Sequence, residues 1–285
     1  MPSAIERWHS QQSDLPVLIR ALRAVLFDRY HQYRDNYDDK YAYAFYCHTR
    51  FISNYLSKAI RKDRYETHKD YNAIFIEVGS EHDSFIGGPE CLFVFVPFYK
   101  ERYERSIEIQ DVSYYLELFN QGLRKASMYD DIPWCVFETA LRSFEMNGCR
   151  NEWIYKKTIF REINLKVEMH CELTTNDFGL RILFFDFKQK KMLCKGVALA
   201  TEANELHYEH LFRGIKLIED GIGIFDFTNR IFVYFNIEDI KNGVFRIQYQ
   251  DYDADRNSSI KGYYDSYIEA IKRALVKNDA LDNRL

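Results

Sequence analysis

The sequence predicts an α+β protein, in which a helical N-terminal part with a short pair of strands precedes a mainly antiparallel sheet with flanking helices. Apolar residues recur at helical spacing in the first half of the chain, and they alternate with polar residues from about residue 153 onward. No crossover helix separates the first three strands of the second half. We therefore expect parts at 1–150 and 151–285, either as two domains or as one fused domain.

The first element expected is a helix near the N-terminus. Ser13 or Asp14 can cap it, Pro16 suits its first turn, and its apolar face would comprise Leu15, Leu18, Ile19, Leu22, Val25 and Leu26. A second helix should follow the polar stretch 34–40. Its residues at helical spacing are Phe45, His48, Ile52, Tyr55, Leu56 and Ala59.

Two short β-rich runs, 72–78 and 91–97, are then expected as neighbouring strands, because the segment between them contains Gly and Pro. Asp111 can cap a following helix. Asp131 and Pro133 can open another, which ends at Gly148 because a glycine after the last periodic residue suits a left-handed cap.

The second part is predicted to begin with an antiparallel meander, with strands at 163–173, 180–187 and 192–200. A helix is expected over 203–218, followed by strands near 222–227, 231–236 and 244–250. Asn242 and Gly243 mark the last turn of this region. A closing helix would bury Tyr264, Tyr267, Ile268, Ile271 and Leu275.

Composition limits the function classes. The net charge is −4 and the pI is about 6.1, so general attraction to nucleic acid or to an acidic membrane is disfavoured. We expect no secretory signal and no membrane span, and therefore a cytoplasmic protein. The six cysteines lack metal-ligand spacing and are expected as reduced thiols. We predict neither a metal nor a cofactor.

Two groups of residues have the types that catalysis would need. His207 and His210 are three apart on the helix expected at 203–218, so both imidazoles could reach one metal ion, although the pattern is not H-E-x-x-H. His82 and Asp83 lie in a Gly-containing loop with acid–base side chains. An ordinary helix surface and a solvated loop are the competing interpretations.

Asp251, Asp253 and Asp255 alternate as the first ligands of a calcium loop do. Arg256 replaces the required glycine and Gly262 replaces the bidentate glutamate, so an EF-hand is excluded. The remaining interpretations are an acidic loop before the last helix and an electrostatic contact with a basic partner. We take the three aspartates as candidate partner-binding residues.

Two adjacent Cys–His pairs are not expected to act as dyads. Cys47 and His48 would point about 100° apart on a helix, and His170 and Cys171 would face opposite sides of a sheet. A core histidine beside a buried thiol is the simpler interpretation of the first pair.

These observations favour a non-enzymatic protein-binding module, such as an immunity protein or another inhibitor that neutralises a toxin or effector. The basis is an acidic, aromatic-rich chain without nucleophile-elbow, dinucleotide or kinase motifs. The alternative is a hydrolase or transferase with a site of dispersed residues where the two parts meet. A small-ligand sensor is a third hypothesis, and self-association stays open.

Overall fold

The computed structural model describes residues 20–21, 24–29, 39–67, 69, 71–79, 85–87, 91–205 and 209–249. Side chains are described for residues 44–67, 69, 71–79, 91–205 and 211–249. The fold of these residues is α+β, as the sequence predicts. The chain divides into two compact units, 1–149 and 150–285.

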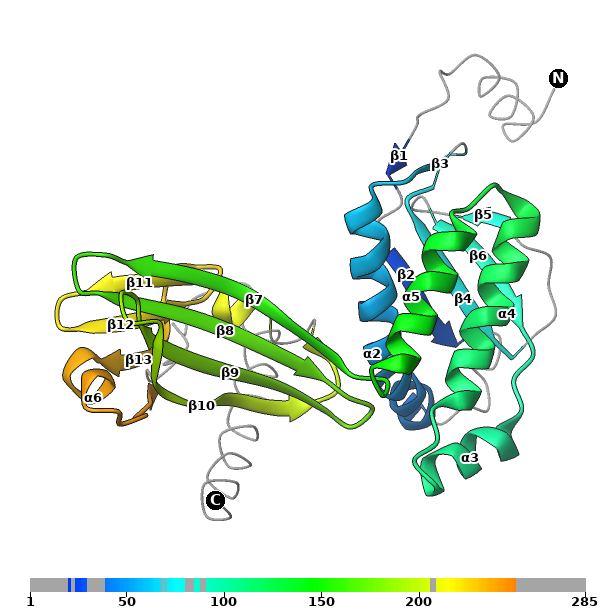
Figure 1. Cartoon of the computed structure of the whole chain (residues 1–285). Coiled ribbons are helices and arrows are strands. Elements are labelled where there is room, and N and C mark those ends of the chain that lie inside the picture. Colours follow the sequence, from blue (N-terminus) through cyan, green and yellow to red (C-terminus); the bar gives the residue numbers. More distant parts are fainter. Residues whose placement is uncertain are drawn as a thin grey trace, which may run out of the picture. The chain divides into compact units, whose positions relative to one another are not determined.

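The N-terminal unit is built on a four-stranded sheet in the order β2-β4-β6-β5 (Figure 1). Its strands are β2 (Ala24–Arg29), β4 (Ala73–Val78), β5 (Phe85–Gly87) and β6 (Cys91–Val96). β2, β4 and β6 run parallel, whereas β5 is antiparallel to β6. β4 and β6 are the predicted neighbours, and they are almost continuously apolar because parallel strands are usually covered on both faces.

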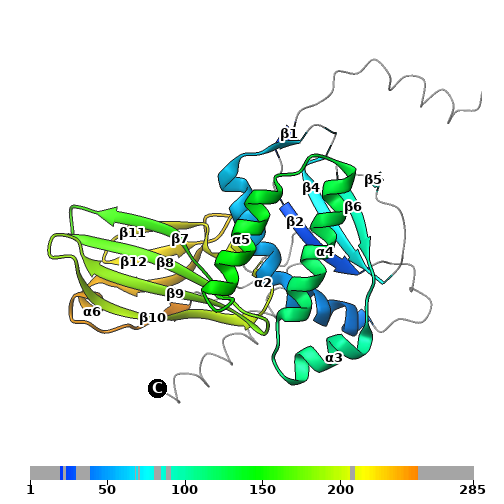
Figure 2. The same cartoon turned by 45° about the vertical axis from the view of Figure 1, so that its right-hand side comes forward.

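The helices of this unit are α2 (Asp39–Asp63), α3 (Lys100–Glu108), α4 (Ser113–Tyr129) and α5 (Trp134–Met146). Figures 1 and 2 show α2, α4 and α5 on the same side of the sheet. Phe51 of α2 packs on Phe144 of α5, with ring centroids 5.5 Å apart. After α5, Gly148 has a φ of +68°, the left-handed conformation predicted for it.

The predicted first helix is wrong where the structure describes it. Residues Arg20–Ala21 form β1, which pairs with β3 (Glu66–Thr67), and the next apolar run forms β2. A short apolar run is compatible with either a buried strand or a buried helix, and here parallel pairing with β4 decides the outcome. The predicted cap at Ser13 or Asp14 lies outside the described residues.

The C-terminal unit contains two four-stranded antiparallel sheets. The first is the predicted meander extended by one strand: β7 (Asn151–Phe160), β8 (Leu165–Leu173), β9 (Asp177–Asp186) and β10 (Lys191–Glu202). The second contains β11 (Gly214–Ile218), β12 (Gly221–Phe225), β13 (Ile231–Asn236) and β14 (Gln248–Tyr249), with the short helix α6 (Ile237–Lys241) after β13.

The inner faces of the two sheets pack on each other. Phe184 of β9 meets Phe235 of β13 edge to face, with centroids 5.0 Å apart. The ring of Phe245 lies where a side chain on Gly196 of β10 would have to be. Figure 1 accordingly shows β11, β12 and β13 behind the sheet of β7 to β10. This arrangement leaves the opposite face of the first sheet directed outward.

The helix predicted over 203–218 is also wrong. The chain forms a 3₁₀ helix at Glu209–Phe212 and then β11, whose residues pair with β12. Phe212, Ile215 and Ile218 have helical spacing, but Ile215 lies in a strand that alternates about the sheet plane. The predicted closing helix at 264–275 falls outside the described residues.

Candidate functional site

Most of the catalytic and partner-binding candidates from the sequence lie outside the described residues: His82, Asp83, His207, Asp251, Asp253 and Asp255. His210 belongs to the 3₁₀ helix, and its side chain is not described. The shared α-helix that would have placed His207 and His210 on one face is absent from the described part of 203–218. An enzyme site built from these residues stays a prediction.

The histidine of each of the two Cys–His pairs lies beside another residue. His48 Nδ1 lies 3.0 Å from the hydroxyl of Tyr103, and burial lowers the pKa of the imidazole. His170 instead bonds Glu168, while Cys171 is buried in the sandwich. His48 is therefore part of the packing between α2 and α3.

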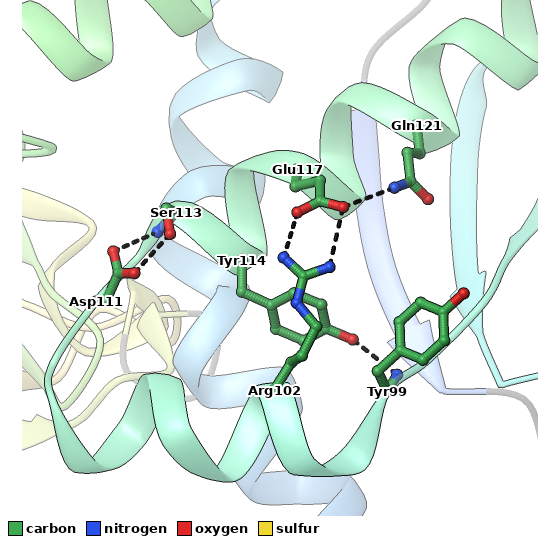
Figure 3. A network of polar contacts seen from close by, with 7 residues as sticks. All are labelled: Tyr99, Arg102, Asp111, Ser113, Tyr114, Glu117 and Gln121. Carbon is green, nitrogen blue, oxygen red and sulfur yellow. Dashed lines mark hydrogen bonds and ion pairs between the residues drawn. The ribbon is translucent and has the colours of Figure 1, made fainter.

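A polar network joins α3 to α4 in the N-terminal unit (Figure 3). The guanidinium of Arg102 donates two hydrogen bonds to the carboxylate of Glu117, and its carbon lies 4.6 Å from the centroid of the Tyr114 ring. The backbone amide of Tyr99 donates to the Tyr114 hydroxyl over 2.9 Å. Arg102 lowers the pKa of Glu117, first through the hydrogen bonds. These groups satisfy one another, so their role is to fix α3 on α4.

The start of α4 is held by Asp111 (Figure 3). Its carboxylate accepts hydrogen bonds from the backbone amide and the hydroxyl of Ser113, at 2.9 and 2.6 Å. These bonds lower the pKa of Asp111. The helix begins at Ser113 and its N-cap residue is Val112, so the predicted cap at Asp111 is wrong by one position, although the Asp111 carboxylate still binds the first helical residue.

The outward face of the first sheet in the C-terminal unit brings exposed apolar and charged side chains together. Strand register places the residues of this face in four rows that cross all four strands. One row, Glu152, Glu172, Gly179 and Ala200, contributes two carboxylates, and the other three rows together hold twelve residues. These three rows are Ile154, His170, Arg181, Val197; Lys157, Glu168, Leu183, Lys195; and Ile159, Lys166, Phe185, Met192. We call these twelve residues the outer face.

The outer face exposes large apolar side chains at its two margins. Ile154 and Ile159 on β7 are 53% and 40% exposed, and Met192 on β10 is 43% exposed. Outward residues of a sheet that has one solvated face are normally polar. These three positions therefore depart from the pattern that solvation alone would produce.

A buried carboxylate lies at the centre of the outer face. Glu168 is only 7% exposed. Its oxygens lie 2.9 Å from His170 Nε2, 3.1 Å from Lys166 Nζ and 3.7 Å from Lys157 Nζ. Burial raises the pKa of Glu168, but the hydrogen bonds from His170 and Lys166 and the adjacent charges outweigh it, so the net shift is downward. Glu168 therefore holds the side chains of Lys166 and His170 in place.

The edges of this sheet are protected against pairing with another strand. β7 has a register shift between Ile154 and Lys156, and β10 has shifts at 192–194 and 197–199. Lysines also occupy both edge strands, at 156, 157, 191 and 195. Bulges and edge lysines are the usual means of preventing edge-to-edge association. Neither edge is therefore suited to pairing with a further strand.

Sequence reasoning did not identify Ile154, Ile159 or Met192. The sequence did contain an indication of such a face. Alternate residues of a strand face opposite sides, and in the run 153–160 both alternating sets contain apolar side chains, so one set must face outward. The register that unites the two isoleucines with Met192 could be read only from the paired strands.

The described residues contain neither a metal-binding cluster nor a membrane-spanning helix. No cluster of three or more His, Cys, Asp or Glu residues able to hold a metal ion occurs within the described ranges. No helix among the described residues combines the length and apolarity needed to cross a membrane. Known family models, curated proteins and solved structures were compared with the chain, and none matched significantly.

Proposed function

We propose that this chain is a protein-binding module and that the outer face is its binding surface. The observation that carries the proposal is the exposure of Ile154, Ile159 and Met192 on one sheet face whose two edges are protected. A module of this kind acts by occupying a surface of its partner. An inhibitor of a toxin or effector, as the sequence favours, is one such module.

The energetic argument begins from the exposed isoleucines. Ile154 and Ile159 keep 53% and 40% of their surface in water after folding, and burying that apolar area against a partner is favourable by about 25 cal/mol per Å². Exposed apolar side chains that gather on one face are typical of surfaces that bind other proteins, and here they stand at the two margins beside charged neighbours. Leu183 and Val197 are half-buried and continue the apolar area between the margins.

The test compares two double variants of the full chain in pull-downs from its own cells at native level. Ile154→Thr with Ile159→Thr removes apolar area from the outer face and keeps β-branched side chains in the strand. Ile107→Thr with Ile109→Thr is the matched control, because these isoleucines are 42% and 57% exposed at the end of α3. Circular dichroism and thermal unfolding should first establish that both variants fold like wild type.

We expect a stoichiometric protein partner to be retained by the wild type and by the control, and to be lost with Ile154→Thr/Ile159→Thr. Loss from the outer-face variant alone would support the proposal, since the two variants remove the same chemical groups. Equal retention by both variants, or the absence of any stoichiometric protein with the wild type, would overturn it.

A further inference from the structure

The segment 99–111, which contains α3, buries few of its side chains. Tyr103 is fully buried and Ser106 is 4% exposed, whereas the other residues from 99 to 111 are exposed. We infer that α3 is a latch that opens while the rest of the N-terminal unit stays folded, and that the place of its Tyr103 ring is a binding site for the phenol ring of a ligand. This site is separate from the outer face, so the inference does not depend on the proposed function.

The helix α3 has little stability of its own. It has nine residues, and isolated helices of this length are marginal in water. Tyr99, its N-cap residue, makes no side-chain cap bond. Gln110 follows the helix with a φ of +52°, in the left-handed region that residues other than glycine rarely adopt. The helix therefore depends on its contacts, and segments with few buried contacts are the ones that open locally.

The contacts between the surface of α3 and α4 are easily exchanged for water. Arg102 and Glu117 form an ion pair whose side chains are 48% and 42% exposed (Figure 3). Exposed ion pairs contribute little stability, because water competes for both charges. The hydrogen bond between the amide of Tyr99 and the hydroxyl of Tyr114 can likewise be replaced by bonds to water. Most of the attachment of α3 therefore comes from Tyr103.

The ring of Tyr103 lies among other aromatic rings. Its centroid is 5.2 Å from that of Phe45, 5.7 Å from that of Phe98 and 6.2 Å from that of Tyr115. Its hydroxyl lies 3.0 Å from Nδ1 of His48. Burial lowers the pKa of His48, so the imidazole is neutral at pH 7 and can accept the hydrogen bond of a phenol. A hydrocarbon ring in the same place would cover that nitrogen without pairing it, which selects a phenol.

The position of α3 relative to the sheet of its unit also favours a ligand site. α3 follows β6 in the chain, and Figures 1 and 2 show it beyond the carboxyl ends of the parallel strands β2, β4 and β6. Ligands of open parallel sheets usually bind outside the carboxyl ends of the strands. In the closed state, Tyr103 therefore lies at the end of the sheet where such a ligand would bind.

Hydrogen exchange of the full chain under native conditions, followed by mass spectrometry, tests whether α3 opens alone. Amides of α3 should exchange at least about tenfold faster than those of α4 and α5. Arg102→Gln removes the ion pair with Glu117 and should speed exchange in α3 severalfold without changing α5. The matched control is Arg142→Gln, which removes an exposed ion pair with Glu138 inside α5 and should leave α3 unchanged. Exchange in α3 as slow as in α4 of the wild type would overturn the latch.

Calorimetric titration with p-cresol and with toluene tests the binding site. The apparent affinity of a site that is open in only a fraction of the molecules is reduced by that fraction. Compared with the wild type and Arg142→Gln, p-cresol should therefore bind severalfold more tightly to Arg102→Gln and at least about tenfold more tightly to Tyr103→Ala. Toluene should bind each protein more weakly than p-cresol does. Equal p-cresol binding by Arg102→Gln and Arg142→Gln, or toluene binding as tight as p-cresol binding, would overturn the inference. Because Arg102→Gln leaves the core intact, this comparison does not depend on the folding of Tyr103→Ala.

A third probe, N-acetyltyrosinamide, distinguishes two sources of the phenol. If it binds Tyr103→Ala more tightly than p-cresol does, the site takes a tyrosine of a partner peptide. If it binds more weakly, the site takes a small phenol, and either result supports the site. If neither probe binds a Tyr103→Ala protein whose circular dichroism matches the wild type, the inference is refuted.

Discussion

Gly122 offers a sharp test of how α4 packs on the N-terminal sheet. A Cβ atom added at this position would lie 2.5 Å from Cγ2 of Ile76 and 2.7 Å from both its Cγ1 and its Cδ1. Carbon atoms in contact normally lie about 3.5–4.0 Å apart. Ile76 is fully buried in β4 and cannot swing into solvent. The substitution Gly122→Ala must therefore move α4, β4 or both.

Two opposing effects set the size of the change. Alanine is favoured over glycine in a helix interior by about 1 kcal/mol. Overpacking of a tight core costs about 1–3 kcal/mol, and contact with three atoms at once favours the upper part of that range. We therefore expect Gly122→Ala to lower the free energy of unfolding by about 1–2 kcal/mol.

The assay is urea unfolding, supported by hydrogen exchange of α4 peptides to attribute the change to the N-terminal unit. Ile76→Ala removes all three clashing atoms and alone should cost about 2–5 kcal/mol because it leaves a cavity. In that background Gly122→Ala should become neutral or stabilising. If Gly122→Ala were neutral in the otherwise wild-type protein, then α4 would not approach β4 this closely.

Three further predictions concern titratable side chains. Glu168→Gln should destabilise the protein by about 1 kcal/mol at pH 7, since it removes the charged acceptor for Lys166. Folding lowers the pKa of Glu168. The difference in free energy of unfolding between wild type and variant, measured with urea, should therefore shrink as the pH falls below the ordinary glutamate pKa. Burial also lowers the pKa of His48, so the unfolded state binds more protons just below the ordinary histidine pKa of about 6.5. Acidification through this range should therefore destabilise the wild type more than His48→Gln. Burial raises the pKa of Cys194 to about 11, so peptide mapping after maleimide treatment at pH 7 should find the exposed Cys135 modified long before Cys194.

The elements predicted correctly are those whose local pattern and tertiary environment agree. α5 has a single apolar stripe with Phe137 and Phe144 fully buried, a proline at its start and a glycine after its end. The alternating residues of β8 likewise place Val167 and Met169 in the sandwich. Short-range rules suffice for such segments because no distant pairing competes with them.

The two wrong helices arose where distant pairing decided the structure. Residues 24–29 become a strand because β4 provides a parallel neighbour about fifty residues later, in the register Val25 to Ile74. Residues 214–218 become a strand through pairing of Ile215 with Ile224. Apolar residues spaced three or four apart were taken as one helical face, although a tight turn and a strand can produce the same spacing.

The outer face could not have been found from spacing alone. Ile154 and Ile159 are five residues apart, and in an uninterrupted strand such residues point to opposite sides. The register shift between Ile154 and Lys156 inserts one residue and returns both isoleucines to the same face. A single bulge therefore determines whether β7 presents one apolar residue or two.

That bulge links the two properties on which the proposed function depends. It disrupts the ladder at the edge of β7, which opposes pairing with another strand, and it aligns Ile154 and Ile159 outward. If the exposed isoleucines contributed only to folding, their replacement by threonine would lower stability and leave association unchanged. Because 53% of Ile154 and 40% of Ile159 are already exposed, we expect the opposite: surface substitutions usually change stability by less than about 0.5 kcal/mol. A loss of binding without a loss of stability would then separate recognition from folding in this sheet.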